Sequence, residues 1–258
     1  MKKSMILAGI ISAFTMWSCS TDTATGNDTA MVNVKLTDAP ALYDAVNIDI
    51  QKVEFTTNNG TTTFNAVNPG VYNLLNFRNG MDVLLSQAIL PVGNVSQMRL
   101  ILGNNNSVVV NGVTYPLDTP SAQQSGLKLN WNQTLSPNGA YNVWIDFDAG
   151  RSIVKTGNGS YKLKPVLRAF SEATDGQIKG YVQPQAANAM VHVIKAADTI
   201  ATALPNADGF FMFRGLPANT YNVSFDAAAN TGYIDQNKAD VNVVFGQITD
   251  LGITTLHQ

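Results

Sequence analysis

The chain of 258 residues has a single cysteine, two histidines and only 13% charged residues. One cysteine excludes an internal disulfide and any metal or redox motif built from cysteine pairs. There are 16 basic residues against 18 acidic ones, and the basic residues form no cluster. Without a basic patch the protein lacks the electrostatic surface that binds nucleic-acid phosphates, so nucleic acid is not expected among its partners.

Signatures of catalysis are also lacking. His192 lies in a segment of alternating apolar residues and His257 is second from the end, so neither is placed as a general base. The sequence has no Gly-x-Ser-x-Gly motif, no glycine-rich phosphate loop and no His-x-x-x-His pair. We therefore expect a protein that is not an enzyme and that has no cofactor.

No apolar run is long enough to cross a membrane as a helix. The run from Met5 to Trp17 has about 13 residues, whereas a spanning helix needs about 20. It follows Lys2 and Lys3, which predicts a signal peptide over residues 1–18. The sequence Met16-Trp17-Ser18-Cys19 resembles the lipobox of bacterial lipoproteins, which implies a lipid on Cys19 and an anchored protein of the cell envelope, at the outer membrane. A free thiol at Cys19 and an uncleaved anchor are the alternatives.

Beyond Cys19 the composition changes twice. Residues 19–30 are small and polar and predict a tether. From Met31 apolar residues alternate with polar ones, the pattern of half-buried strands. Asn111-Gly112 lies between two valine-rich runs and predicts a tight hairpin. Only Met81 to Leu90 has helical spacing, and Pro165 predicts an edge strand or a bulge within residues 161–170.

A second series of strands follows a polar stretch at residues 171–176. Turn residues such as Asp208-Gly209 separate these strands at intervals typical of a small sandwich. The sequence therefore predicts an all-β fold class with two consecutive β-sandwich domains, over residues 31–172 and 176–258.

Two families resemble these segments. The first segment contains Leu36-Thr37-Asp38-Ala39-Pro40, Asp146-Phe147-Asp148-Ala149 and Leu163-Lys164-Pro165-Val166. With these motifs residues 31–170 resemble the family called domain of unknown function 4382, which implies a β fold in an extracytoplasmic setting but no activity. The second segment contains Asp208-Gly209-Phe210 and Gly215-Leu216-Pro217. With these motifs residues 176–256 resemble the carboxypeptidase regulatory-like domains, whose transthyretin-like sandwich is often grouped with carbohydrate-binding folds.

Acidic residues near these motifs are the candidates for a ligand site. Alternation from Tyr141 onward places Trp144, Asp146 and Asp148 on one face, opposite an apolar face. An exposed tryptophan beside two carboxylates would suit sugar stacking, and the two acids could also hold calcium or act as a glycosidase pair. The favoured alternative is that the acids form a solvated face or cap turns, and that a loop covers Trp144.

Two further aspartates complete the candidate ligand-binding set. Asp38 is expected to bond the turn at Ala39-Pro40. Asp49 alternates with isoleucines, is expected to point outward, and joins a binding surface only if its strand neighbours residues 141–148. Asn206 and Asp208 resemble the start of a calcium loop only loosely, and a hairpin turn is the expected role.

We expect the protein to work by binding rather than by catalysis. The first hypothesis is a membrane-anchored binding module for a glycan or protein ligand, and the alternative is a structural or accessory subunit of an envelope assembly. An exposed aromatic and acidic surface near Trp144 would favour the first hypothesis. A long, unpaired apolar edge strand would favour the second.

Overall fold

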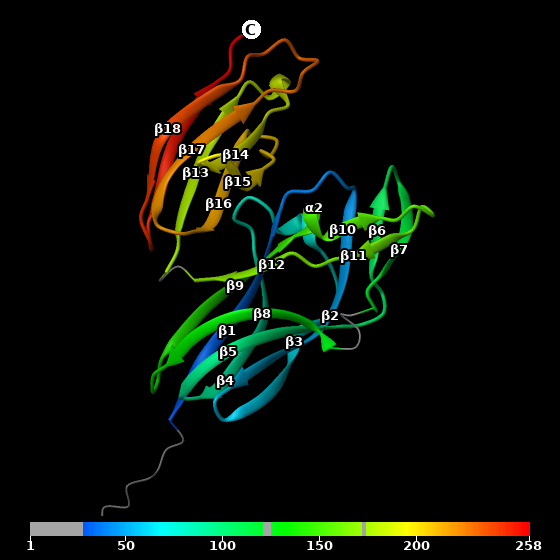
Figure 1. Ribbon diagram of the computed structural model, residues 1–258, viewed down its shortest axis with the longest axis vertical. Helices are drawn as coiled ribbons and strands as arrows, with labels where there is room; N and C mark the ends of the chain where they lie inside the picture. Colours follow the sequence, from blue (N-terminus) through cyan, green and yellow to red (C-terminus); the bar gives the residue numbers. More distant parts are fainter. Residues whose placement is uncertain (1–27, 121–124, 172–173) are drawn as a thin grey trace, which may run out of the picture.

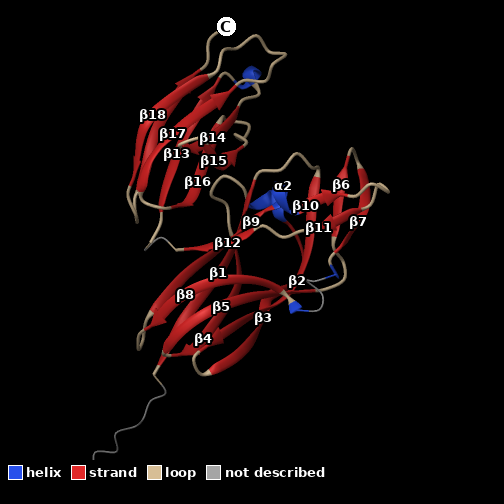
Figure 2. Ribbon diagram, viewed as in Figure 1, coloured by secondary structure: helices blue, strands red, loops and turns tan. Residues whose placement is uncertain are grey.

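The computed structural model describes residues 28–120, 125–171 and 174–258. Cys19, the signal peptide and most of the tether lie outside these residues, as do residues 172 and 173 at the expected boundary between the domains. The described residues are almost entirely strand, with only a few short helical turns (Figure 2). None of their helices is long and apolar enough to span a membrane. The all-β prediction is confirmed.

Residues 28–171, here called the first unit, form two sheets that face each other. The smaller sheet has the order β12-β9-β1-β4, and the larger runs β10-β11-β7-β6-β2-β5-β8 with β3 beside β2. The strands are β1 (Thr29–Ala39), β2 (Ala45–Thr57), β3 (Gly60–Asn73), β4 (Val83–Pro91), β5 (Gly93–Leu102), β6 (Ser107–Val110), β7 (Val113–Asp118), β8 (Leu127–Leu135), β9 (Ala140–Asp148), β10 (Ile153–Lys155), β11 (Tyr161–Leu163) and β12 (Leu167–Phe170). Two short helices are η1 (Leu74–Phe77) and α2 (Ala149–Ser152).

Residues 174–258, the second unit, form a smaller sandwich at the end of the molecule away from residue 28 (Figure 1). Its sheets have the orders β16-β13-β19 and β15-β14-β17-β18. The strands are β13 (Gly176–Gln183), β14 (Met190–Lys195), β15 (Asp198–Ala203), β16 (Phe210–Leu216), β17 (Asn219–Asp226), β18 (Gln236–Val243) and β19 (Ile248–Thr255), and a single turn, η2, spans Gln185–Ala187.

Each unit has its own hydrophobic core. Val32, Val34 and Leu36 of β1 are fully buried in the first core, which draws on residues between 30 and 163. Ile178 and Phe211 belong to the second core, which draws on residues between 178 and 256. Apolar side chains at every second position pack between paired sheets because successive residues of a strand face opposite sides. The alternating pattern therefore determines both cores.

The predicted hairpin at Asn111-Gly112 is confirmed. Both residues have positive φ angles, 50° and 74°, and they join β6 directly to β7. A two-residue turn with two positive φ angles matches the twist of the strands, and asparagine followed by glycine adopts it at least cost.

The predicted helix from Met81 to Leu90 is wrong, because β4 occupies this segment. Val34 of β1 pairs with Ser86 and the next residue, Lys35, pairs with Leu84, so one residue of β4 is extra. This bulge shifts the alternation and leaves both Leu85 and Ser86 buried. Apolar residues then fall three and four positions apart, which imitates the spacing of a helix.

Pro165 stands between two strands rather than inside one. β11 pairs in the larger sheet of the first unit, whereas β12 is the terminal strand of the smaller sheet. The chain therefore crosses from one sheet to the other at the proline. This crossing carries β12 along β9 and on toward the second unit (Figure 1).

Candidate functional site at the junction of the two units

Trp144 of β9 lies buried where the two units meet. Its side chain is 3% exposed and stacks on Phe170 of β12, with ring centroids 5.8 Å apart and planes 10° from parallel. Lys35 and Arg214 add cations at 4.9 Å and 5.7 Å from the ring centroid. The hypothesis of an exposed stacking tryptophan is therefore wrong. The alternative of a covered ring holds, although the second unit contributes to the cover through Arg214 of β16.

Asp82 connects this tryptophan to the second unit. Its Oδ2 accepts hydrogen bonds from Trp144 Nε1 and from Arg214 Nη1, each at 2.8 Å, and Lys35 Nζ lies 3.6 Å from Oδ1. Burial alone would raise the pKa of this carboxyl, but the two donors and the charge of Lys35 outweigh it and hold the pKa below its usual range. Asp82 is not among the residues expected at a site.

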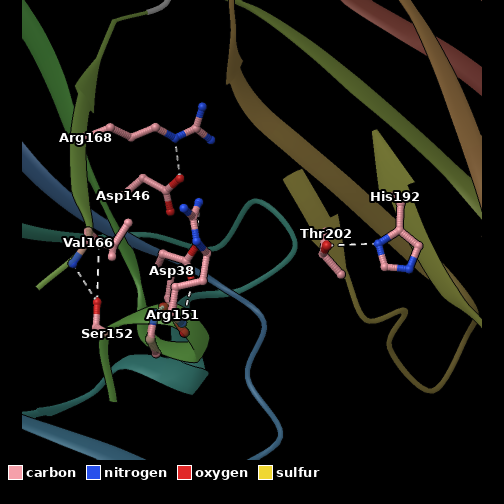
Figure 3. A network of polar contacts seen from close by, with 10 residues as sticks. Asp38, Asp146, Arg151, Ser152, Val166, Arg168, His192 and Thr202 are labelled. Carbon is pink, nitrogen blue, oxygen red and sulfur yellow. Dashed lines mark hydrogen bonds and ion pairs between the residues drawn. The ribbon is translucent and has the colours of Figure 1, made fainter. Parts of the chain in front are cut away.

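Asp146 is bound by an arginine that also reaches the second unit. Arg168 of β12 donates from Nε to Asp146 Oδ2 at 2.6 Å, as Figure 3 shows. Its Nη1 and Nη2 donate to the backbone carbonyls of Gly215 and Arg214 at 2.7 and 3.0 Å. Burial raises the pKa of Asp146, and the neighbouring guanidinium opposes this rise only in part. One side chain thus neutralises a buried acid and ties β12 to β16.

Asp148 has the cap role that was the favoured alternative. Its Oδ1 accepts the Arg151 backbone N–H at 2.9 Å at the start of α2, and Arg151 Nη1 lies 3.8 Å from Oδ2. A carboxylate in this position satisfies a helix N–H that has no partner within the helix. The carboxylates of Asp146 and Asp148 thus serve separate partners.

The predicted role of Asp38 in the Ala39-Pro40 turn is wrong. Asp38 Oδ1 instead accepts the backbone N–H of Ala149 at 3.0 Å, because the parallel pairing of β1 with β9 places Ala39 opposite Asp148. Its other oxygen, Oδ2, is buried and has no hydrogen-bond partner among the described residues. Burial raises the pKa of Asp38 well above its usual range, and the Ala149 hydrogen bond offsets only part of that rise.

Asp49 does not point outward, and this expectation is wrong. Its side chain is 2% exposed and accepts hydrogen bonds from Asn105 N at 3.1 Å and from Gln51 Nε2. The alternation of Ile48, Asp49 and Ile50 is intact, because the register shift in β2 comes after Ile50. Asp49 is buried because the segment after β5 covers it: the Gly103 N–H donates to the Asp49 carbonyl at 2.8 Å, and Asn106 Oδ1 accepts the Asp49 N–H at 2.9 Å. β2 belongs to the larger sheet and does not neighbour β9, so the condition for Asp49 to join that surface is not met.

A cleft of about 710 Å³ separates the two units beside this junction. One wall comes from the first unit and includes Asp148, Arg151 and the loop at residues 39–43. The other wall is the outer face of β14 and β15, which carries His192 and Thr202 (Figure 3). A cleft of this volume lies within the range of sites that bind small molecules.

The polar row in that second wall resembles a catalytic triad only in its residue types. Thr202 Oγ1 lies 2.9 Å from His192 Nδ1, while His192 Nε2 is 3.5 Å from Asp226 Oδ2, too long for an orienting hydrogen bond. Asp226 instead accepts a short hydrogen bond from Ser224. An activated nucleophile needs a base held by a third group. The row is therefore a set of cross-strand polar contacts.

The described residues contain no group of three or more histidine, cysteine, aspartate or glutamate side chains that could hold a metal ion. Nor does the loop at Asn206 take the form of a calcium loop. Asn206 Oδ1 accepts the backbone N–H groups of Asp208 and Phe210, at 3.0 and 2.9 Å, which closes a tight turn. This turn connects β15 to β16, which belong to different sheets, so the predicted turn is present but it does not form a hairpin.

The sequence and these contacts define a class of protein: an all-β chain with two sandwich cores joined by a buried polar junction. Residues 29–165 match the family described as Domain of unknown function (DUF4382). This match covers more than half of the chain, and the protein belongs to this family, as the motifs at Asp38 and Asp146 predicted. No curated protein matches the sequence. The resemblance of the second unit to carboxypeptidase regulatory-like domains stays a prediction.

Several solved structures align over 89% of this chain at low identity. The Bacillus anthracis TIE protein is 13% identical with a TM-score of 0.25, and this chain covers 34% of it. A fimbrial protein from Bacteroides ovatus ATCC 8483 is 8% identical with a TM-score of 0.26 and 50% of its chain covered. The shaft pilin spaA from Lactobacillus rhamnosus GG is 10% identical with a TM-score of 0.24 and 98% covered. TM-scores this low do not establish a shared fold.

Proposed function

We propose that the protein is a non-catalytic structural or accessory component of a cell-envelope assembly, anchored by a lipid on Cys19 and displaying its two units in a fixed relation. The observation that carries this proposal is the junction. Trp144 and Asp146, the side chains best suited to a ligand, are engaged by Phe170, Asp82 and Arg168 instead. Groups already satisfied and buried contribute little to ligand binding. The bonds that cross the junction, from Arg168 to the Gly215 carbonyl and from Arg214 to Asp82, oppose separation of the units.

A measurement of the distance between the units tests this role. Spin labels at Ile89→Cys and Ile234→Cys, exposed 66% and 60%, would report one position in each unit. We expect a narrow distance distribution in the native junction and a broad one in Arg214→Met, which removes the hydrogen bond to Asp82. Arg99→Met is the matched control, because its ion pair with Glu54 at 3.2 Å lies within the first unit. A distribution already broad with Arg214 in place would contradict the proposal.

The membrane anchor is tested separately. Cys19→Ala should move the protein from the membrane fraction to the soluble fraction, because several acyl chains hold a protein firmly on a bilayer. Tight membrane association of this variant would refute the anchor. Protease treatment of intact cells, scored by loss of the protein, distinguishes display at the cell surface from a periplasmic location.

The cleft supports a second candidate function, the binding of a glycan or protein ligand. His192, Thr202 and Arg151 offer hydrogen-bonding groups on opposite walls, and Arg151 has a side chain that is 71% exposed. A panel of immobilised oligosaccharides and peptides, probed with native protein and with His192→Ala, tests it. Binding that His192→Ala lowers at least tenfold supports the cleft, and binding that this variant leaves unchanged excludes it.

A further inference from the structure

The outer face of the sheet β16-β13-β19 carries an apolar row that nothing in the described chain covers fully. Tyr181 of β13 pairs with Phe210 of β16 on one side and with Ile253 of β19 on the other. Tyr181 and Ile253 are 41% and 60% exposed, and the rings of Tyr181 and Phe210 lie 5.3 Å apart. We call these three residues the apolar row.

Other apolar residues extend the surface along β19. Ile248 at its start is 51% exposed, and Phe245 in the preceding turn is 59% exposed. Scattered exposed apolar residues are ordinary, but several on one strand, here on both sides of Asp250, indicate a candidate interaction surface.

A charged row lies directly beside the apolar row. Lys179 of β13 pairs with Asp250 of β19, and Lys179 Nζ lies 3.3 Å from Asp250 Oδ2. Their side chains are 39% and 54% exposed. In the apolar row β13 carries a tyrosine and β19 an isoleucine, and in the charged row β13 carries a positive charge and β19 a negative one.

The edge of β19 is less suited to a partner than the face. Lys238 of β18 donates from Nζ to the carbonyl of Leu251 at 2.7 Å, and Asp250 Oδ1 accepts the Gly252 N–H at 2.9 Å. A register shift between Lys179 and Tyr181 marks a bulge here, and Gly252 has a φ of 62°. Bulges and lysines at an edge discourage the addition of another strand. A partner would therefore lie on the face.

We propose that this face binds a second copy of the same chain, and the proposal rests on the structural role proposed above. A two-fold axis parallel to the strands, passing between β13 and β19, places Tyr181 against Ile253 of the second copy. The same axis places Lys179 against Asp250 of the second copy, and each contact occurs twice. A surface that complements itself in this way is what a symmetric pair requires.

The geometry also suits two chains anchored in one membrane. Rotation about an axis parallel to the strands preserves their direction, so residue 28 of both copies lies toward the same side. The outer side of β16 is occupied by the first unit, because Met212 packs against Gly80 and Arg214 bonds Asp82. The open part of the face is β13 and β19, and two strands about 4.8 Å apart with eight residues of about 3.3 Å each give roughly 250 Å². Standard stable interfaces bury about 800 Å² per partner, so the association is weak in solution and depends on concentration at the membrane.

Cross-linking between two differently tagged copies in isolated membranes tests the contact. One copy carries Tyr181→Cys and the other Ile253→Cys, and a bismaleimide that spans about 10 Å, the packing distance of two sheets, joins them. The matched control pairs Met31→Cys with Ile89→Cys, which neighbour each other on β1 and β4 and are 38% and 66% exposed. We expect at least tenfold more product from the Tyr181 and Ile253 pair. Equal yields, or none from that pair, would overturn the inference.

Charge reversal shows whether the salt bridge also forms between copies. Lys179→Asp alone and Asp250→Lys alone should each lower cross-linking between like copies at least fivefold. A mixture of the two should restore it between unlike copies, because each reversed charge then meets its opposite. A role confined to the ion pair within one chain would give no such recovery, and its absence would refute the proposed axis. Failure here with a narrow distance between the units would leave the proposed structural role intact.

Discussion

Arg168 offers the sharpest test of how the two units are joined. Arg168→Met keeps the length of the side chain but removes the charge from Asp146 and the donors from the carbonyls of Arg214 and Gly215. Removing one partner of a buried ion pair costs about 3–5 kcal/mol, because the other charge is left buried. The side chain of Asp146 is 11% exposed and that of Arg168 is 39% exposed. We therefore expect the lower end of the range, about 3 kcal/mol.

Urea unfolding followed by tryptophan fluorescence measures this loss. With a slope of about 3 kcal/mol per molar urea, the midpoint of unfolding should fall by about 1 M. The effect should be larger at pH 8 than at pH 5. Arg168 opposes the rise in the pKa of Asp146, so that pKa should rise further in Arg168→Met. The ionised carboxyl then costs the variant more stability than it costs the native protein, and this difference grows as the pH rises.

Two further variants separate the buried charge from the loss of packing. The double variant Asp146→Asn with Arg168→Met removes the unpaired charge and should regain about half of the loss. Lys162→Met is the control, because its ion pair with Asp118 spans 3.7 Å between side chains that are 54% and 53% exposed, and such pairs contribute less than about 1 kcal/mol. The proposed role of Arg168 is refuted if Arg168→Met shifts the midpoint no more than Lys162→Met, or if the double variant regains nothing.

Three other changes have defined outcomes. Trp144→Ala should lower the free energy of unfolding by about 3–5 kcal/mol in the same urea assay, since it empties a buried aromatic contact, and a loss below about 1 kcal/mol would contradict that packing. Asp38→Asn should raise the free energy of unfolding at pH 8 by about 1 kcal/mol, seen as a higher melting temperature, because it removes a buried charge and keeps the acceptor for Ala149. That gain should shrink toward pH 4 as the raised pKa lets the native carboxyl protonate, and a gain independent of pH would count against the burial of this charge as its cause. The lowered pKa of Asp82 stabilises the fold above about pH 4 and this contribution is lost as the pH falls further, so Asp82→Asn should flatten the loss of stability between pH 5 and pH 3 measured by calorimetry.

The local sequence pattern predicted burial and turns correctly where the strands are regular. Val32, Val34 and Leu36 alternate and are buried as expected, and Asn111-Gly112 turns between two strands as expected. It failed at bulges, where one extra residue shifts the alternation. β4 imitated a helix in this way. Asp49 was misplaced for another reason, since Asn106, which covers it, is 57 residues away in the sequence.

At the candidate site, too, the sequence predicted the local contacts and missed the long-range ones. Asp146 and Asp148 were found from sequence, and the cap role of Asp148 was among the expected alternatives because it depends on neighbours a few residues away. The partners of Trp144 were not found, since Asp82 and Arg214 are 62 and 132 residues from the groups they bond. No local pattern specifies contacts between segments that far apart.

Sequence by itself determined that this chain is built of strands, that its apolar residues form sandwich cores, and that Cys19 is the residue expected to hold it on a membrane. These properties follow from the side-chain period of a strand and from residue chemistry, and both are local. Only the tertiary structure decided that β1 lies parallel to β9 and that Asp38 therefore reaches α2. It also decided that Trp144, expected to be exposed, is covered by Phe170 of the first unit and Arg214 of the second. Strand order and the docking of one sandwich on another depend on long-range contacts, so the function of Trp144 could be read only from the folded chain.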